Sequence, residues 1–244
     1  MTRSPVRTAV VWDALRGALA ERAASAGRGV LDIVDAGGGT GGFAVPLAEL
    51  GHDVTVVDPS PDSLAALERR AKEKGVGVRA IQGDAADLGE LLPKDGADLV
   101  LCHSVLEYVE DPISALTAVS GLLRHGGAVS VLAANPLASS LHRALTGHFD
   151  EALAVLDDPE GRWGERDPTP RRFTPAALSE LLAATGFAVG PALGVRVFAD
   201  LVPSRLVDGE PGAVEALVAL EQAAAAHPVL REIAAQVHVL AHKP

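Results

Sequence analysis

The stretch Val34–Gly42, which reads VDAGGGTGG, decides the fold of this chain of 244 residues. An apolar, β-branched run, Gly29–Val34, precedes the glycines, and a segment with helical spacing, Phe43–Leu50, follows them. The glycines therefore lie on a turn from a strand into a helix. Backbone without side chains can approach a ligand closely at such a turn, and the free N–H groups of the new helix favour an anionic group there.

An acid at the end of the next strand extends this motif. Asp58 follows the apolar run Val54–Val57 and is placed to accept hydrogen bonds from two ribose hydroxyls. The turn and this acid together predict a nucleoside-bearing cofactor. The glycines alone leave its identity open, because Gly37, Gly39 and Gly42 also satisfy the G-x-G-x-x-G pattern of NAD-binding dehydrogenases.

Two further acids separate these possibilities. Asp35 precedes the turn, so that Asp35–Gly41 spells D-x-G-x-G-x-G, which resembles motif I of the class I S-adenosylmethionine-dependent methyltransferases. Asp84 follows a third expected strand, Val76–Ile81, and could reach the adenine amino group. Acids at the ends of strands two and three favour a methyltransferase over a dehydrogenase.

Strand-like and helix-like segments alternate from Val30 to about Ala134, which predicts five strands of a parallel sheet. Two more strands are expected at Phe187–Val197 and Gln236–His242. The predicted fold is α/β: a Rossmann-like, seven-stranded, mostly parallel sheet with helices on both faces. Its ligand crevice lies at the carboxyl ends of the strands. The residues expected at those ends are Gly37, Asp58, Asp84 and His103.

The same pattern predicts a single methyltransferase domain over residues 1–244. An N-terminal helix (1–28) precedes the cofactor-binding core (29–134). A polar, proline-bearing segment (135–175) then reads as a substrate-side insertion after strand five, and 176–244 completes the sheet with a helical insertion near Glu210–Ala226.

Composition limits the remaining classes. No apolar stretch reaches the roughly 20 residues that span a bilayer, and the N-terminus lacks the core of a signal peptide, so we expect a cytoplasmic protein that does not enter a membrane. The net charge of −11 argues against extended binding to nucleic acid. The single cysteine, Cys102, lies in an apolar strand and fits an inert thiol. The scattered histidines predict no metal site.

Segments outside the cofactor motifs are similar to the bacterial tRNA 5-carboxymethoxyuridine methyltransferases. They are Arg7–Trp12, Asp35–Gly39, His103–Pro112, Gly147–Asp150, Arg166–Thr169 and Gly194–Phe198. The last of these, Gly-Val-Arg-Val-Phe, is not a general methyltransferase motif and therefore adds specificity to the resemblance.

The resemblance implies a set of S-adenosylmethionine contacts. Arg7 would pair with the methionyl carboxylate, to which a guanidinium offers a two-pronged match. His103 would lie beside the methionyl end, or serve only as a satisfied polar group at a strand end. The other implied cofactor contacts are Asp35, Gly37, Gly38 and Gly39 at the turn, Asp58 at the ribose, and Asp84 and Ala85 at the adenine.

The family esterifies the terminal carboxylate of a modified wobble uridine in tRNA. A carboxylate is already deprotonated at neutral pH, so no general base is needed, and alignment with exclusion of water supplies the rate. Arg196 is the first choice for orienting the acceptor, with His103 as the second catalytic residue, although Arg196 could instead form a structural ion pair. Arg171 and Arg172 are the other substrate-binding candidates. For a hydroxyl or amine acceptor, the candidate bases are His103, His142 and His148.

One departure from the family concerns the acceptor. The proteobacterial members carry a lysine-rich run in the insertion, whereas Asp157–Arg166 has mixed charge, which weakens a phosphate-binding surface. Trp163 could stack on a base there or anchor the loop. The expected partner is therefore either a tRNA anticodon loop or a small-molecule carboxylate. A non-catalytic protein that binds the cofactor is a further alternative.

Overall fold

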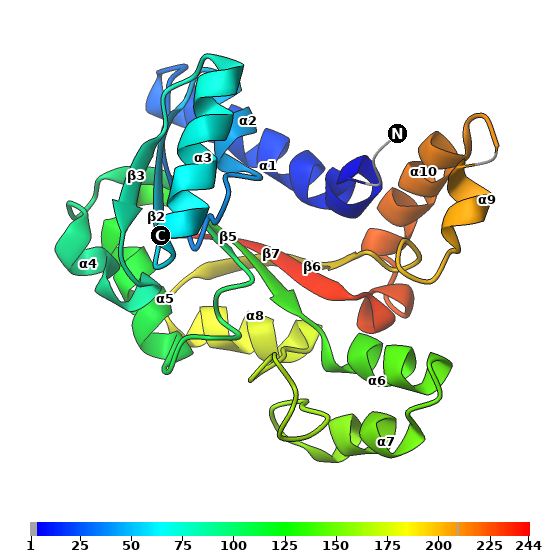
Figure 1. The fold of residues 1–244 in the computed structure, drawn as a ribbon. Coiled ribbons are helices and arrows are strands. Elements are labelled where there is room, and N and C mark those ends of the chain that lie inside the picture. The colour runs from blue at the N-terminus through cyan, green and yellow to red at the C-terminus, as the bar shows by residue number, and fades with distance from the viewer. Residues whose placement is uncertain (1–3, 209) are drawn as a thin grey trace. The chain divides into compact units, whose positions relative to one another are not determined.

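A computed structural model of the protein describes residues 4–208 and 210–244 (Figure 1). Seven strands form one sheet in the order β3-β2-β1-β4-β5-β7-β6. Their bounds are β1 Asp32–Ala36, β2 Asp53–Asp58, β3 Arg79–Gln82, β4 Ala97–His103, β5 Leu123–Ala134, β6 Ala188–Val195 and β7 Gln236–His242. The pairings β1 with β2, β1 with β4, and β2 with β3 are parallel. The prediction of a seven-stranded, mostly parallel α/β sheet is confirmed.

The central strands β1, β2 and β4 are buried along most of their length, as their largely apolar sequences predict. Ile33 of β1 is paired with Val54 of β2 on one side and with Leu99 of β4 on the other. Cys102, near the end of β4, is buried, and its pKa is raised to about 12 by burial and then by the charges of Glu107 and Asp35. The structure confirms that this cysteine is buried, and its inertness stays a prediction.

Short sequence signals begin several helices. Ser60, Asp111 and Asn135 each stand before a proline, and each side chain accepts a hydrogen bond from a backbone N–H of the first turn. The α-helices are α1 Ser4–Ala26, α2 Ala44–Glu49, α3 Pro61–Lys74, α4 Leu88–Leu91, α5 Pro112–Leu122, α6 Pro136–Leu145, α7 Phe149–Asp157, α8 Pro175–Ala184, α9 Ser204–Asp208 and α10 Ala213–Ala225. Two 3₁₀ turns, η1 Ala85–Asp87 and η2 Leu230–Ile233, complete the list.

The chain divides into two compact units, each assembled from segments far apart in the sequence. The strand-rich unit comprises Gly17–Val131, Leu181–Gly190 and Leu240–Pro244. The helix-rich unit comprises the chain up to Arg16, Leu132–Glu180 and Pro191–Val239. The single-domain organisation expected from the sequence stays a prediction.

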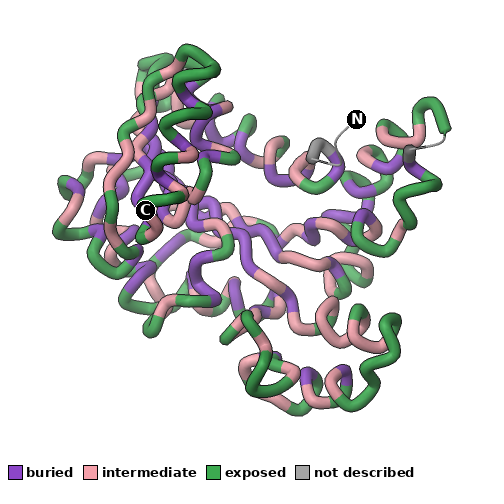
Figure 2. Tube along the Cα trace, viewed as in Figure 1, coloured by how far each residue is buried: buried purple, intermediate pink, exposed green. Residues whose placement is uncertain are grey.

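In the strand-rich unit, helices pack beside the parallel strands. Helix α3 contacts β2 and β3, and α2 contacts α3 and β2 (Figure 1). Figure 2 shows the strands largely buried and the outer faces of these helices exposed. The third strand begins at Arg79 rather than at Val76 as expected, because its pairing with β2 starts where Arg79 meets Thr55.

In the helix-rich unit, α6 and α7 lie side by side (Figure 1). They form most of the segment 135–160, for which the sequence pattern predicted an insertion but no helices. Both are exposed or half-buried over most of their length (Figure 2), yet Leu137, Leu141 and Leu145 of α6 recur every four residues, a helical spacing that the prediction overlooked.

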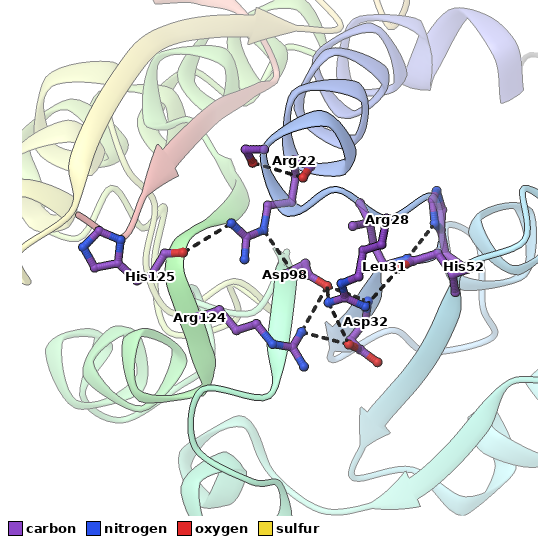
Figure 3. Close-up of polar contacts among 10 residues, drawn as sticks. Arg22, Arg28, Leu31, Asp32, His52, Asp98, Arg124 and His125 are labelled. Carbon is purple, nitrogen blue, oxygen red and sulfur yellow. Dashed lines mark hydrogen bonds and ion pairs between the residues drawn. The ribbon is translucent and has the colours of Figure 1, made fainter.

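The amino ends of β1 and β4 are joined by a buried ion cluster (Figure 3). The Asp98 side chain is 0% exposed and accepts hydrogen bonds from Arg22 Nε at 3.0 Å, Arg124 Nη1 at 3.0 Å and the Asp32 N–H at 2.8 Å. Arg28 Nη2 is a further partner. Burial alone would raise the pKa of Asp98, but these donors and charges outweigh it and lower the pKa.

Within the described part of the chain, no helix combines the length and the apolar character needed to cross a bilayer.

Candidate active site

The glycine turn has a backbone that only glycine adopts readily. Gly37, Gly39 and Gly41 have φ of 67°, 54° and 78°, in the left-handed region. A Cβ on Gly37 would lie 2.5 Å from Val105 Cγ2, and one on Gly41 would lie 2.3 Å from Leu67 Cδ1. The turn is therefore both conformationally and sterically restricted to glycine, and it leaves backbone open where a ligand can approach.

Asp58, at the end of β2, fastens this turn to the sheet. Its Oδ2 accepts the Gly39 N–H at 2.8 Å, and its Oδ1 accepts the Ser60 N–H at 2.9 Å. Each carboxylate oxygen has two lone pairs, so both retain the capacity to accept from a hydroxyl. The side chain is thus held in one orientation and remains suited to a ribose.

Asp35 lies beneath the turn. It is buried at the end of β1, and a Cβ on Gly38 would meet its Oδ2 at 2.7 Å. Burial, and then the charge of Asp58, raise the pKa of Asp35 to about 7. This geometry supports the turn from below, and direct contact of Asp35 with the cofactor stays a prediction.

A cavity of about 240 Å³ opens at the carboxyl ends of these strands in the strand-rich unit. Its lining includes Gly37, Asp58, Asp84 and Ala85, all predicted from the sequence. Asp84 also caps η1 by accepting the Ala86 N–H at 3.1 Å. The remaining lining residues are Pro59, Ser104, Val105, Tyr108 and Val109. The sequence predicted His103 at these strand ends, but His103 does not line this cavity, whereas four later residues of the block His103–Pro112 do.

His103, at the end of β4, is held by its neighbours. Its Nε2 lies 2.8 Å from Ser130 Oγ, and its ring meets that of Phe43 edge-on at 4.7 Å between centroids. These contacts fix the ring plane. The structure therefore provides an oriented imidazole beside the turn region, while its contact with the methionyl end stays a prediction.

The helix-rich unit has a separate cavity of about 420 Å³. Three predicted site residues, Arg7, Arg172 and Arg196, line it together with His142. The other lining residues are Ala134, Asn135, Ala138, Ser139, Leu141, Thr169, Val197, Asp200, Leu201, Ile233 and Ala235. Arg171 and His148 are not among them.

Two of these arginines share one carboxylate. Asp200 Oδ1 lies 3.1 Å from Arg7 Nη2, and Asp200 Oδ2 accepts from Arg196 Nε at 2.8 Å. Arg196 also donates to Gln236 Oε1 at 3.3 Å. The structural ion pair that the sequence left open for Arg196 is therefore present, but its carboxylate is divided between two cations.

Arg172 is bound differently. Its guanidinium meets buried Asp167 in two bonds of 2.7 and 3.0 Å and also donates to the Gly161 carbonyl at 2.8 Å. Burial would raise the pKa of Asp167, but Arg172 and backbone donors outweigh it and lower the pKa. Arg171 pairs with Glu160 at 2.8 Å. Of the three candidate arginines, Arg196 is the one whose partner is shared with another cation at the cavity.

A larger cavity of about 530 Å³ in the strand-rich unit lies at the opposite, amino ends of the strands. Its lining includes Asp32, Asp53, Arg79 and Ala97 and none of the residues predicted for the site. Among the described residues, no three His, Cys, Asp or Glu side chains gather as a metal ion would require.

The fold and the site of the strand-rich unit define a class I S-adenosylmethionine-dependent methyltransferase. The glycine turn between β1 and α2, with acids at the ends of β2 and β3, has the chemistry that the nucleoside of this cofactor requires. The family model for a methyltransferase domain matches residues 34–131. The fold of magnesium protoporphyrin IX methyltransferase from Synechocystis PCC 6803, solved with bound SAH, is similar with a TM-score of 0.59 at 17% identity, covering 99% of this chain and 83% of that one.

The chain belongs to the tRNA 5-carboxymethoxyuridine methyltransferase family. It is 32% identical over 245 residues to the protein of that name from Escherichia coli (strain K12), covering 100% of this chain and 90% of the relative. A ubiquinone biosynthesis O-methyltransferase of Azorhizobium caulinodans is 30% identical over 165 residues, covering 68% of this chain and 62% of that protein.

Proposed function

We propose that this protein transfers a methyl group from S-adenosylmethionine to the terminal carboxylate of 5-carboxymethoxyuridine in tRNA, and so forms a methyl ester. The full-length similarity to a tRNA 5-carboxymethoxyuridine methyltransferase supports this acceptor. The observation that carries the proposal is the charge of the cavity in the helix-rich unit. A cytoplasmic location, where tRNA is found, is part of the proposal.

The cavity has an unbalanced cation. Buried Asp167 neutralises Arg172, whereas Arg7 and Arg196 share Asp200. Since the Asp200 carboxylate is divided between two guanidiniums, the charge of Arg196 is only partly neutralised, and Arg196 can bind a further carboxylate. An acceptor carboxylate bound at Arg196 keeps its negative charge and can still act as a nucleophile, because an arginine does not give up a proton to it.

The protein's part in the reaction is orientation. S-adenosylmethionine supplies an activated methyl group on a sulfonium sulfur; a carboxylate oxygen forms the new bond to that carbon as the sulfur–carbon bond breaks. No proton moves, so the chain needs no general base. We assign Arg196 to orienting the acceptor, Arg7 and His103 to the methionyl end of the cofactor, and Arg171 and Arg172 to supporting positions. Holding the acceptor carboxylate and the methyl carbon close to their reactive alignment raises the rate of transfer, because the reactants do not have to reach that orientation by random motion.

The cofactor assignments follow the cavity of the strand-rich unit. We assign the backbone of Gly37 and Gly38 to the methionyl part of the cofactor, Asp58 to its ribose, and Asp84 and Ala85 to its adenine. Their positions support these roles, since Gly37, Asp58, Asp84 and Ala85 line one cavity. Asp35 and Gly39 shape the turn from which these contacts are made.

Several features favour a small-molecule acceptor as the alternative. His142 lines the same cavity as Arg196, and a hydroxyl acceptor would need such a base. The segment 135–175 carries five arginines against seven carboxylates. Arg143, Arg162 and Arg171 are already paired with acids of that segment, so they offer little to phosphates.

An assay with purified protein separates the two functions. The protein is incubated with S-adenosylmethionine and tRNA that carries 5-carboxymethoxyuridine, and the tRNA nucleosides are analysed by mass spectrometry. We expect that nucleoside to gain the mass of one methyl group, and the fraction methylated to fall in Arg196→Ala. If tRNA that carries 5-carboxymethoxyuridine stays unmethylated while the protein methylates a phenolic or carboxylic small molecule, the tRNA acceptor is rejected. tRNA with an unmodified wobble uridine is the control.

A further inference from the structure

A buried glutamate lies behind the cavity that holds Arg196. Glu221 is 0% exposed, in the middle of α10, on the face that also buries Leu217 and Ala224. Leu217 precedes it by four residues and Ala224 follows by three, so an acid occupies the helix face that the spacing assigns to the core. A charged side chain in this position is costly unless it is fully hydrogen-bonded.

The partners of Glu221 are three consecutive backbone N–H groups. Oε2 accepts from Val197 at 2.8 Å, and Oε1 accepts from Phe198 at 2.8 Å and from Ala199 at 2.6 Å. These residues follow Arg196 directly, where β6 has ended and the strand ladder no longer supplies acceptors. Among side chains of this length, ionised glutamate is the one whose two terminal atoms both accept hydrogen bonds and donate none.

The backbone at Arg196 needs such support. Arg196 has φ of 61°, a left-handed conformation that is strained for a residue with a side chain. Its carbonyl accepts the Ala235 N–H at 3.2 Å, and Gly194 lies so close to η2 that a Cβ there would be 2.8 Å from Arg231 Cα. Contacts therefore hold the chain before and at Arg196, and Glu221 holds it immediately afterwards.

The turn that Glu221 binds also delivers both partners of the ion pair. Arg196 precedes the three donors and Asp200 follows them, and the two side chains meet at the cavity. A shift of residues 197–199 would change the direction of the guanidinium and of the carboxylate that shares it. Phe198 and Val197 pack with Leu217 and Ala224 in the adjoining apolar clusters, which fixes α10 against this turn.

We propose that Glu221 is a positioning residue for the acceptor site: it binds the backbone of residues 197–199 and thereby sets the direction in which Arg196 presents its guanidinium to a carboxylate. This proposal rests on the proposed function, in which Arg196 binds the acceptor. It assigns no contact between Glu221 and the substrate.

The test compares steady-state kinetics of full-length variants with tRNA that carries 5-carboxymethoxyuridine. In Glu221→Gln, an amide group that donates replaces one accepting oxygen and faces a backbone N–H. We expect KM for tRNA to rise on the order of tenfold and KM for S-adenosylmethionine by less than about threefold, because Arg7 meets this turn at Asp200, beyond the three bound N–H groups. Glu215→Gln is the matched control, because it makes the same change on an exposed residue of the same helix, and it should leave both constants unchanged.

A double-mutant cycle distinguishes positioning from a general loss of structure. In an Arg196→Lys background, Glu221→Gln should change KM for tRNA less than twofold, because the guanidinium that it orients is gone. The same tenfold factor in both backgrounds, or an unchanged KM in Glu221→Gln alone, would overturn the proposal. If Glu221→Gln is not obtained folded, Glu221→Asp withdraws both oxygens by one methylene, and the same outcomes apply.

The two levels of the proposal fail in different ways. If Arg196→Lys leaves KM for tRNA unchanged, or if the wild-type protein does not methylate this tRNA, the proposed function fails and the role of Glu221 with it. If Arg196→Lys raises KM and Glu221→Gln acts independently of it, only the positioning role is rejected.

Discussion

Replacing Asp98 by asparagine tests whether the ion cluster in Figure 3 stabilises the fold. The change keeps the side chain's shape and one accepting oxygen but removes the charge that three arginines face. Asp98 is fully buried, whereas its three arginines are between 15% and 39% exposed, so solvent can replace the lost interactions only in part. Removing one partner of a buried ion pair costs about 3–5 kcal/mol, because it leaves uncompensated charge behind.

This cost is large enough to measure by thermal unfolding. For a chain of this size, 1 kcal/mol corresponds to roughly 2–4 °C, so Asp98→Asn should lower Tm by about 6–20 °C. Asp32→Asn is the control: Asp32 contacts two of the same arginines, but its side chain is 39% exposed. An exposed pair contributes up to about 1 kcal/mol, which predicts a fall of no more than about 4 °C.

The pH dependence supplies an independent check. The pKa of Asp98 is lower in the folded protein than in the unfolded chain, so its contribution to stability is present above the unfolded pKa, near 4, and is lost as the pH falls through the folded pKa. The difference in Tm between wild type and Asp98→Asn should therefore narrow below about pH 4. Equal falls in Tm for Asp98→Asn and Asp32→Asn at pH 7 would refute this reasoning. So would a Tm difference between wild type and Asp98→Asn that stays the same on acidification.

Three further predictions concern the two cavities. Gly41→Ala should lower the free energy of unfolding by about 1–3 kcal/mol and weaken binding of S-adenosylmethionine in calorimetry, because Gly41 has φ of 78° and buried Leu67 blocks the new Cβ. Gly42→Ala is the control: its Cβ would lie in open space, so neither quantity should change. The raised pKa of Asp35, about 7, means that its contribution to stability falls as the pH rises from about 4 to 7, so Asp35→Asn should gain Tm relative to wild type over that range; a constant difference would contradict the assignment. Arg196→Ala should raise KM for tRNA at least tenfold and Arg171→Ala less than threefold in the methyl-transfer assay, and equal effects would contradict the choice between them.

Local patterns predicted most of the strand-rich unit correctly. The glycine turn, Asp58 at the end of β2 and Asp84 just after β3 all lie where the sequence indicated, and so does the last strand, Gln236–His242, most of which belongs to the helix-rich unit. Each depends on a few adjacent residues: alternation or an apolar run for a strand, and glycine where φ is positive. The main omission lay in 135–175, where α6 and α7 have apolar residues at helical spacing, but the prolines and polar residues of the segment suggested an insertion without regular structure.

The polar partners of the site residues were not predictable in the same way. The sequence block Gly194–Phe198 indicated Arg196. Nothing in it indicated Asp200, whose carboxylate pairs with both Arg7 and Arg196. Glu221 stands 25 residues beyond Arg196, and nothing in the local sequence connects an acid on a helix with three N–H groups of a distant turn. The one local sign of this contact is that Glu221, an acid, occupies a position of α10 that faces the core.

The sequence by itself determined the class of protein and its cofactor turn, because backbone conformation and the succession of strands and helices are encoded by neighbouring residues. Only the tertiary structure decided which arginine has charge to offer. Arg171, Arg172 and Arg196 are chemically identical in the sequence, and their difference arises from the carboxylates that folding places beside each: Glu160 for the first, buried Asp167 for the second, and a shared Asp200 for the third. Coulomb interactions act over a few ångströms in space, whatever the separation along the chain.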